Sequence, residues 1–280
     1  MERTLPHHFG GVGFMKRIIL SIFLSATGVI LASDPPQHID VSRLPGQATV
    51  VDNVIIPVPS EVFGVLDKLG SPNWHDVLRS PKINPTGERA QVALMLGSVI
   101  AEGFIAVEAQ EGEEVKKIGR SVLNLAAAVG VRKSVTARSN AIIEAADKKE
   151  WQTVRKELDG AMQDVKEAMI ELHDEHLAQL VSLGGWLRGT EALTAVILKN
   201  YSKDTAELLH QPTLLEFFQR RLDGLDSRLK GNSLVAKIQK RLPEIRPLMG
   251  ESDGDISLKS VEQIHEMMQE LVKRIDTREK

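Results

Sequence analysis

Two histidines and a carboxylate lie close together in ELHDEHL, residues 171–177, at a spacing that helical metal sites use. His173 and His176 are three residues apart, which on a helix places both rings on one face, with Glu175 nearby. Histidines in this arrangement bind metal ions together with carboxylates from facing helices. The ferritin-type pattern also requires a glutamate three residues before each histidine, and neither histidine has one. The favoured interpretation is two structural or solvent-facing histidines, with a metal site as the alternative.

A second candidate is Glu102, within the apolar stretch VALMLGSVIAEGFIAV at residues 92–107. The stretch is too short to span a membrane, so we predict that it is a central core helix. Its carboxylate is expected to face solvent at the edge of the apolar side, to pair with a basic side chain, or to be functional, because burial without a partner is costly. The basic residue that we predict for such a pair is Arg188. Glu191 lies one helical turn after Arg188 and is a further possible partner.

Glycines are concentrated in SLGGWLRG, residues 182–189, within a segment that otherwise has helical periodicity. Each mid-helix glycine costs about 1 kcal/mol relative to alanine, so something is expected to approach this backbone closely. We predict that Gly184, Gly185 and Gly189 serve helix packing, with Gly185 and Gly189 facing another helix. The alternatives are a contact with a ligand or partner, or a kink at Gly184 and Gly185 that opens a pocket.

The common catalytic and cofactor-binding motifs are missing from the sequence. It contains no GxSxG, HExxH, P-loop or EF-hand pattern, and no glycine-rich loop that follows a strand. The lack of cysteine excludes disulfides, thiolate metal sites and cysteine nucleophiles. A net charge of −3 with interspersed signs is typical of an ordinary soluble surface and not of a nucleic-acid-binding protein. We therefore predict no catalytic residues, no cofactor and no nucleic-acid partner.

Helical periodicity extends over almost all of the chain after residue 59 and predicts an all-α fold. The architecture that we expect is an irregular multi-helix bundle, in which helical hairpins surround two or three long central helices, with an extended N-terminal leader. Capping residues and periodicity predict helices at residues 60–70, 73–80, 86–110, 111–129, 132–149, 150–200, 202–210, 212–229, 232–249 and 258–274. Residues 60–250 would form the helical domain, and residues 251–280 a polar hinge with an amphipathic C-terminal helix.

A complete export signal pattern begins at Met15, which we expect to be the true start of the chain. Lys16 and Arg17 precede an apolar run that ends near Ser33 and is shorter than the roughly 20 residues of a membrane-spanning helix. Residues 1–33 are thus predicted to be a signal peptide, with a retained anchor as the alternative. Residues 34–59 are rich in proline and predict an extended leader, a strap or a mobile linker, with any strand confined to residues 48–56.

These observations favour a non-enzymatic protein that is exported to the periplasm or secreted. The first hypothesis is an envelope protein that binds a partner protein or serves as a scaffold, without a stable membrane span after signal cleavage. The alternative is a helical bundle that binds a metal ion or small ligand between helices, through Glu102, His173, His176 and Arg188. An enzyme of unfamiliar design is a third hypothesis. The first two differ in whether Glu102 and His176 point into a shared cavity.

Overall fold

The computed structural model describes residues 49–51, 54–56, 72–80, 83–250 and 255–277. The predicted signal peptide at residues 1–33 and the predicted helix at residues 60–70 lie outside the described residues. All described residues belong to one compact unit, residues 35–280. Within this unit the fold is all-α, as the helical periodicity predicts.

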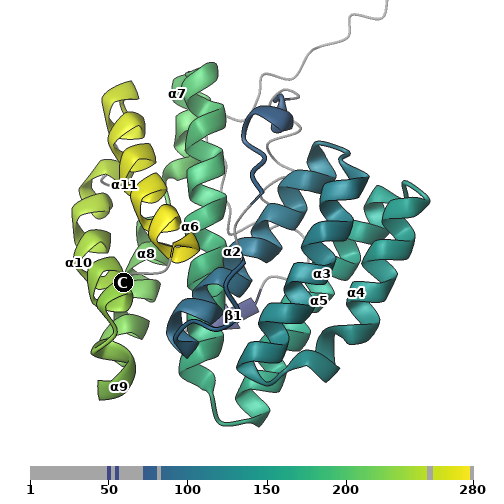
Figure 1. Cartoon of the computed structure of the whole chain (residues 1–280). Coiled ribbons are helices and arrows are strands. Elements are labelled where there is room, and N and C mark those ends of the chain that lie inside the picture. The colour runs from purple at the N-terminus through teal and green to yellow at the C-terminus, as the bar shows by residue number, and fades with distance from the viewer. Residues whose placement is uncertain (1–48, 52–53, 57–71, 81–82, 251–254, 278–280) are drawn as a thin grey trace, which may run out of the picture. The chain divides into compact units, whose positions relative to one another are not determined.

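Two long helices, α2 (Arg89–Glu108) and α6 (Glu175–Lys199), pack against each other at the centre of the unit (Figure 1). The sequence of α2 is apolar on all sides, and a helix of that kind is stable in water only when it is surrounded by other helices. By length and composition α2 is the one helix in the described part that could cross a membrane, but 94% of its apolar window is buried inside the bundle. It is the core helix that the sequence predicts.

The remaining helices pack on either side of this central pair (Figure 1). On one side lie the successive hairpin helices α3 (Gly112–Val129), α4 (Arg132–Asp147) and α5 (Trp151–Glu171). The other side contains α8 (Pro212–Asp223), α9 (Ser227–Lys230), α10 (Ser233–Ile245) and α11 (Leu258–Asp276). The short helices α7 (Lys203–Ala206) and η3 (Glu207–Leu209) connect α6 to the second group. In addition, η2 (Trp74–Asp76) precedes α2, and η4 (Arg246–Met249) lies between α10 and α11.

Several predicted helix ends have the expected capping contacts. The side chains of Ser202, Asn232 and Ser257 each accept a hydrogen bond from the backbone N–H three residues later. Gly130 ends α3 with a φ of 92°, in the left-handed region that glycine adopts without strain. Pro243 does not divide α10, which continues to Ile245.

A short antiparallel hairpin is formed by β1 (Thr49–Val51) and β2 (Val54–Ile56), with Thr49 opposite Ile56. Both strands fall within the predicted range of residues 48–56. Strand β2 packs against α8. This part of the leader therefore lies against the helical bundle, as a strap would.

The predicted helix at residues 150–200 is in fact two helices, and the break is not at the glycines. Helix α5 ends at Glu171 and α6 begins at Glu175, while Gly184 and Gly185 lie inside the uninterrupted α6. His173 has a φ of 58°, and the N–H groups of His173 and Asp174 donate to the carbonyls of Ile170 and Met169. This pair of hydrogen bonds is a Schellman motif, which satisfies the last carbonyls of α5 and turns the chain.

Candidate functional site

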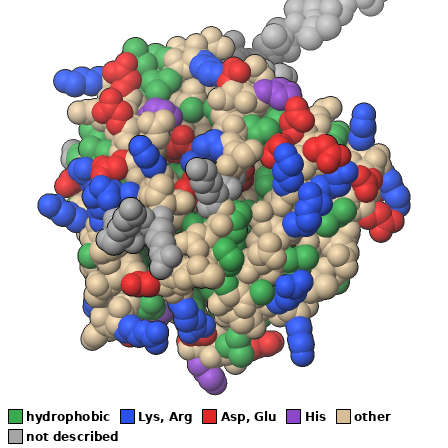
Figure 2. Space-filling model, in the orientation of Figure 1, with side chains coloured by type: hydrophobic (Ala, Val, Ile, Leu, Met, Phe, Trp, Pro, Cys, Tyr) green, Lys and Arg blue, Asp and Glu red, His purple; other side chains and the backbone are tan. Residues whose placement is uncertain are grey.

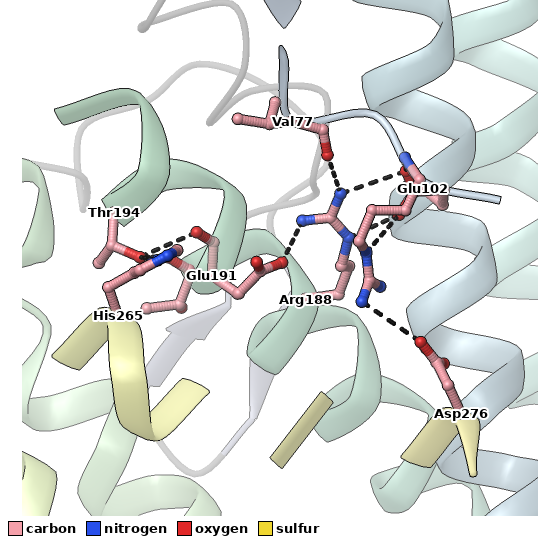
Figure 3. A network of polar contacts seen from close by, with 9 residues as sticks. Val77, Glu102, Arg188, Glu191, Thr194, His265 and Asp276 are labelled. Carbon is pink, nitrogen blue, oxygen red and sulfur yellow. Dashed lines mark hydrogen bonds and ion pairs between the residues drawn. The ribbon is translucent and has the colours of Figure 1, made fainter. Parts of the chain in front are cut away.

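The centre of the candidate site is Arg188 of α6, a fully buried arginine that binds groups from two other segments (Figure 3). Its Nε donates to Glu102 Oε2 at 2.5 Å, and its Nη2 reaches Glu102 Oε1 at 3.2 Å, so the pair is bidentate. Nη1 donates to Glu191 Oε2 at 2.5 Å, and Nη2 also donates to the carbonyl of Val77 at 2.6 Å. All three guanidinium nitrogens therefore have acceptors within the protein.

Glu102 of α2 is as deeply buried as Arg188 and holds a second cation. Its Oε1 accepts a hydrogen bond of 2.5 Å from the backbone N–H of Arg79, and its Oε2 lies 3.5 Å from Arg79 Nε. The segment at residues 72–80 is anchored nearby by the buried side chains of Trp74 and Val77. The carboxylate of Glu102 thus joins α2 both to α6 and to this segment.

The C-terminal helix α11 reaches the same cluster through Asp276, its last residue. Arg79 Nη1 donates to Asp276 Oδ2 at 3.2 Å. Gln91 of α2 donates to the carbonyls of Ile275 and Thr277, at 3.2 and 2.8 Å, and so holds the end of α11. We call Arg79, Glu102, Arg188, Glu191 and Asp276 the charge cluster.

At both Arg188 and Asp276, burial and the neighbouring opposite charges shift the pKa in opposite directions. Burial works to lower the pKa of Arg188, but the carboxylates of Glu102 and Glu191 outweigh it, and the pKa is raised above the ordinary value for arginine. Burial raises the pKa of Asp276 from 3.8 to about 6, against the opposing effect of Arg79. Arg188 thus remains a cation, whereas the pKa of Asp276 is raised toward the physiological range.

A second polar contact lies near Glu191, where α6 meets α11 (Figure 3). Thr194 Oγ1 lies within 2.9 Å of the Thr190 and Glu191 carbonyls, and 3.0 Å from His265 Nδ1. If the hydroxyl donates to a carbonyl, the ring must donate through Nδ1, which fixes the tautomer. Because Thr194 is fully buried, its hydroxyl serves packing between helices and is not exposed to a substrate.

The structure brings together two of the four residues that the sequence predicts for ligand binding, and separates the other two. Glu102 and Arg188 form the predicted pair, and Glu191 joins it as expected. His173 is an exposed residue of the turn between α5 and α6, so it does not share a helical face with His176. His176 is half-buried at the start of α6, about 18 Å along the helix axis from Arg188.

Neither histidine therefore lines a site with the buried pair. Among the described residues, no group of three or more histidine, aspartate or glutamate side chains is arranged to hold a metal ion. The physical reason is local: the Schellman turn at His173 takes this residue out of the helical register on which the alternative interpretation, a metal site, depends.

The glycines of α6 form a packing contact with α2, through two of the three glycines that the sequence predicts for it. A methyl group on Gly184 would overlap the carbonyl of Leu94, and one on Gly97 of α2 would lie 2.8 Å from the backbone nitrogen of Gly185. A methyl group on Gly189 would meet no atom within 4 Å. The packing seam thus consists of Gly97, Gly184 and Gly185, and Gly189 lies outside it.

Several contributors to the charge cluster are not apparent from the sequence. Arg79 and the Val77 carbonyl belong to a segment whose helical interpretation was based on a cap at Asn73, but only Trp74–Asp76 is helical there. Asp276 lies at the end of an amphipathic helix, where an acidic residue ordinarily faces solvent. The one feature of the sequence that could have indicated a special role for Asp276 is its place at a helix C-terminus, where a carboxylate interacts unfavourably with the helix dipole.

On the surface, charges of both signs are interspersed over the face shown in Figure 2. Among the described residues, the exposed large apolar side chains are Ile170, Leu172 and Leu258, with exposed fractions of 50%, 53% and 42%. Ile170 and Leu172 lie together at the turn between α5 and α6. We call these two side chains the apolar tip.

We compared the chain with protein-family models, curated proteins and solved structures, and none of them matches it.

Proposed function

We propose that this protein is an exported helical protein of the cell envelope that acts by binding a partner protein, as a binding module or scaffold. The observation that carries the proposal is that the buried pair of Arg188 and Glu102, at the centre of the charge cluster, is fully engaged by groups of the protein itself. Every guanidinium nitrogen of Arg188 donates to a protein oxygen, and both oxygens of Glu102 accept from arginine nitrogens. Groups arranged in this way join helices, and a partner would therefore be bound by residues on the surface.

The surface feature that fits this role is the apolar tip, because it is presented on a well-fixed turn. The Schellman hydrogen bonds hold the turn itself, and Arg89 of α2 binds both oxygens of Asp174, at 3.2 and 2.6 Å. Ordered apolar side chains lose little entropy when they enter a partner's pocket. Glu171 is exposed between Ile170 and Leu172. The partner that fits is a protein with an apolar pocket and basic groups at its rim.

Export is supported by the pattern of residues 15–33, with its positive start, its short apolar run and the small residues near Ser33. The lack of cysteine is compatible with an envelope protein whose stability comes from its core instead of from disulfides. An extensive apolar core of this kind is present in the bundle.

A site-specific photocrosslinker tests the proposal in cells of the native host. We would place it at Leu172 in the full chain and, as the control, at Lys133, an exposed position on α4. We expect a discrete crosslinked product with an envelope protein from position 172 that Ile170→Glu abolishes and Leu258→Glu preserves. Identical products from positions 172 and 133, or a product that Ile170→Glu does not change, would contradict the role of the apolar tip.

A further inference from the structure

The charge cluster contains three carboxylates and only two cations. Arg188 is bound by Glu102 and Glu191, and Arg79 is shared between Glu102 and Asp276. Because Glu102 and Glu191 already engage Arg188, Asp276 is the carboxylate in excess. Its side chain is only 16% exposed, so water compensates little of its charge.

The position of Asp276 on its helix adds to this excess. It is the last residue of α11, where the free carbonyls form the negative end of the helix dipole and disfavour a carboxylate. Its Oδ2 binds Arg79, but its Oδ1 is buried and accepts no hydrogen bond. In the ionised form, this oxygen is a buried acceptor without a donor, which is a costly state.

Charged groups on the other elements around α11 do not correct the imbalance. The groups that face Asp276 are Arg79 from residues 72–80, Glu102 from α2, and Arg188 and Glu191 from α6. Two of these four are themselves acidic.

Helix α10 also packs against α11, but its cations act elsewhere. Lys237 and Arg241 bind Glu270, and so does Arg274 of α11 itself. Glu270 lies six residues before Asp276, about 9 Å along the helix axis. Besides the buried side chains of Leu271, Val272 and Ile275, the C-terminal end of α11 is held by Gln91 and by one contact to Arg79, at a carboxyl group that the cluster does not neutralise.

We propose that residues 271–277 of α11 are a pH-sensitive latch, which is closed on the charge cluster when the Asp276 carboxyl is protonated and loosens when that carboxyl loses its proton. Protonation makes the cluster neutral, because two cations then face two carboxylates. The geometry of the cluster is the basis of the proposal, and the raised pKa of Asp276, about 6, agrees with it. The latch is independent of the proposed partner.

The direction of the effect follows from linkage. When the end of α11 separates from the cluster, the carboxyl returns toward its ordinary pKa of 3.8, so the open form releases the proton more readily than the closed form. Raising the pH from about 5 to about 7.5 therefore favours the open form. From the two pKa values, the equilibrium ratio of open to closed molecules increases about tenfold over this range. The change should be largest at the end of the helix.

Hydrogen–deuterium exchange on the full chain tests this directly. After correction for intrinsic exchange rates, we expect protection of residues 271–277 to fall about tenfold between about pH 5 and about pH 7.5. Protection of residues 258–266 should fall less, because openings that leave Asp276 in the cluster do not depend on its charge. Asp276→Asn, which keeps the shape and removes the charge, should abolish the fall. Glu266→Gln, at an exposed position of the same helix, should leave it unchanged.

Three results would overturn the proposal. The first is equal protection of residues 271–277 at both pH values in the unaltered protein. The second is a fall in Asp276→Asn as large as in the unaltered protein. The third is an equal fall at residues 258–266, because that would show a general loss of stability and not a local latch.

Discussion

The close approach of α2 and α6 leads to a prediction in which three glycines of one helix respond differently to the same substitution. Gly184→Ala would place a methyl group against the Leu94 backbone, where it would overlap the carbonyl oxygen and lie 2.7 Å from the carbonyl carbon. The obstacle is main chain of the opposite helix, so no side chain can rotate away. The two helices would have to move apart.

The size of the effect follows from two opposing contributions. Alanine is favoured over glycine inside a helix by about 1 kcal/mol. Overpacking a tight core contact typically costs about 1–3 kcal/mol, and the upper end applies here because the contact is with rigid backbone. We therefore expect Gly184→Ala to reduce the free energy of unfolding by about 2 kcal/mol.

Gly185→Ala and Gly189→Ala are the matched controls on the same helix. At Gly185 the nearest atom to a methyl group is Met162 Cε, 3.3 Å away at the end of a flexible side chain, so we expect a change within about 1 kcal/mol of zero. At Gly189 the space is open, and alanine should raise the stability by about 0.4–1 kcal/mol.

Urea denaturation followed by far-ultraviolet circular dichroism measures all three variants, provided that the slopes of the transitions agree. The expected order of stability is Gly189→Ala, then Gly185→Ala, then Gly184→Ala. If Gly184→Ala were as stable as the unaltered protein, the backbones of α2 and α6 could not be as close as described, and the packing argument would be wrong.

Further predictions concern the charge cluster, the helix ends and the N-terminus. Arg188→Met should cost about 3–5 kcal/mol in urea denaturation, because it leaves two carboxylates buried without their cation, and adding Glu102→Gln should recover part of this loss. Asp276→Asn should stabilise the protein by about 1–2 kcal/mol near neutral pH and much less near pH 4, which thermal melting at both pH values checks. The reason is that the raised pKa of the Asp276 carboxyl lowers the free energy of unfolding as the pH rises from 3.8 to about 6, and asparagine does not ionise. Lys149→Gly should add about 1 kcal/mol to the free energy of unfolding, because Lys149 has a φ of 57° at a helix end. N-terminal sequencing of protein from the native host should begin within residues 33–36, and an intact Met15 start on cytoplasmic protein would exclude export.

The sequence was sufficient to predict the fold class and most helices because these depend on local patterns. Apolar residues at helical spacing mark the buried faces, and Ser202, Asn232 and Ser257 mark helix starts by capping chemistry. The core position of α2 could also be predicted, since a helix that is apolar all round must be enclosed.

The turn at His173 could not be predicted in the same way. Within the part of the chain that the structure describes, three helix ends have a non-glycine residue with positive φ, at Gln110, Lys149 and His173, where the sequence lacks the usual glycine signal. Periodicity continues through such a turn, because both flanking helices bury apolar residues. The prediction of one helix over residues 150–200, and of two histidines on one face, failed for this reason.

The site was predictable only as a pair. An acidic and a basic residue, each within a strongly apolar helix, need partners, and Glu102 with Arg188 was the simplest solution. Arg79 and Asp276 reach the same point through tertiary structure alone, since 197 residues separate them in the sequence. No local pattern encodes such a distance.

The glycine seam and the charge cluster are parts of one arrangement. Contacts between α2 and α6 proceed in the same order along both helices, from Gly97 beside Gly185 to Glu102 beside Arg188, so the helices run in roughly the same direction. Close approach at the seam places the next turns near enough for a bidentate ion pair and leaves little room for water between them. A charged pair enclosed in this way is stable only while its geometry is kept, because its desolvation is compensated by short hydrogen bonds. The small residues that let the helices meet are thus also what allows an arginine to be buried at the centre of the bundle.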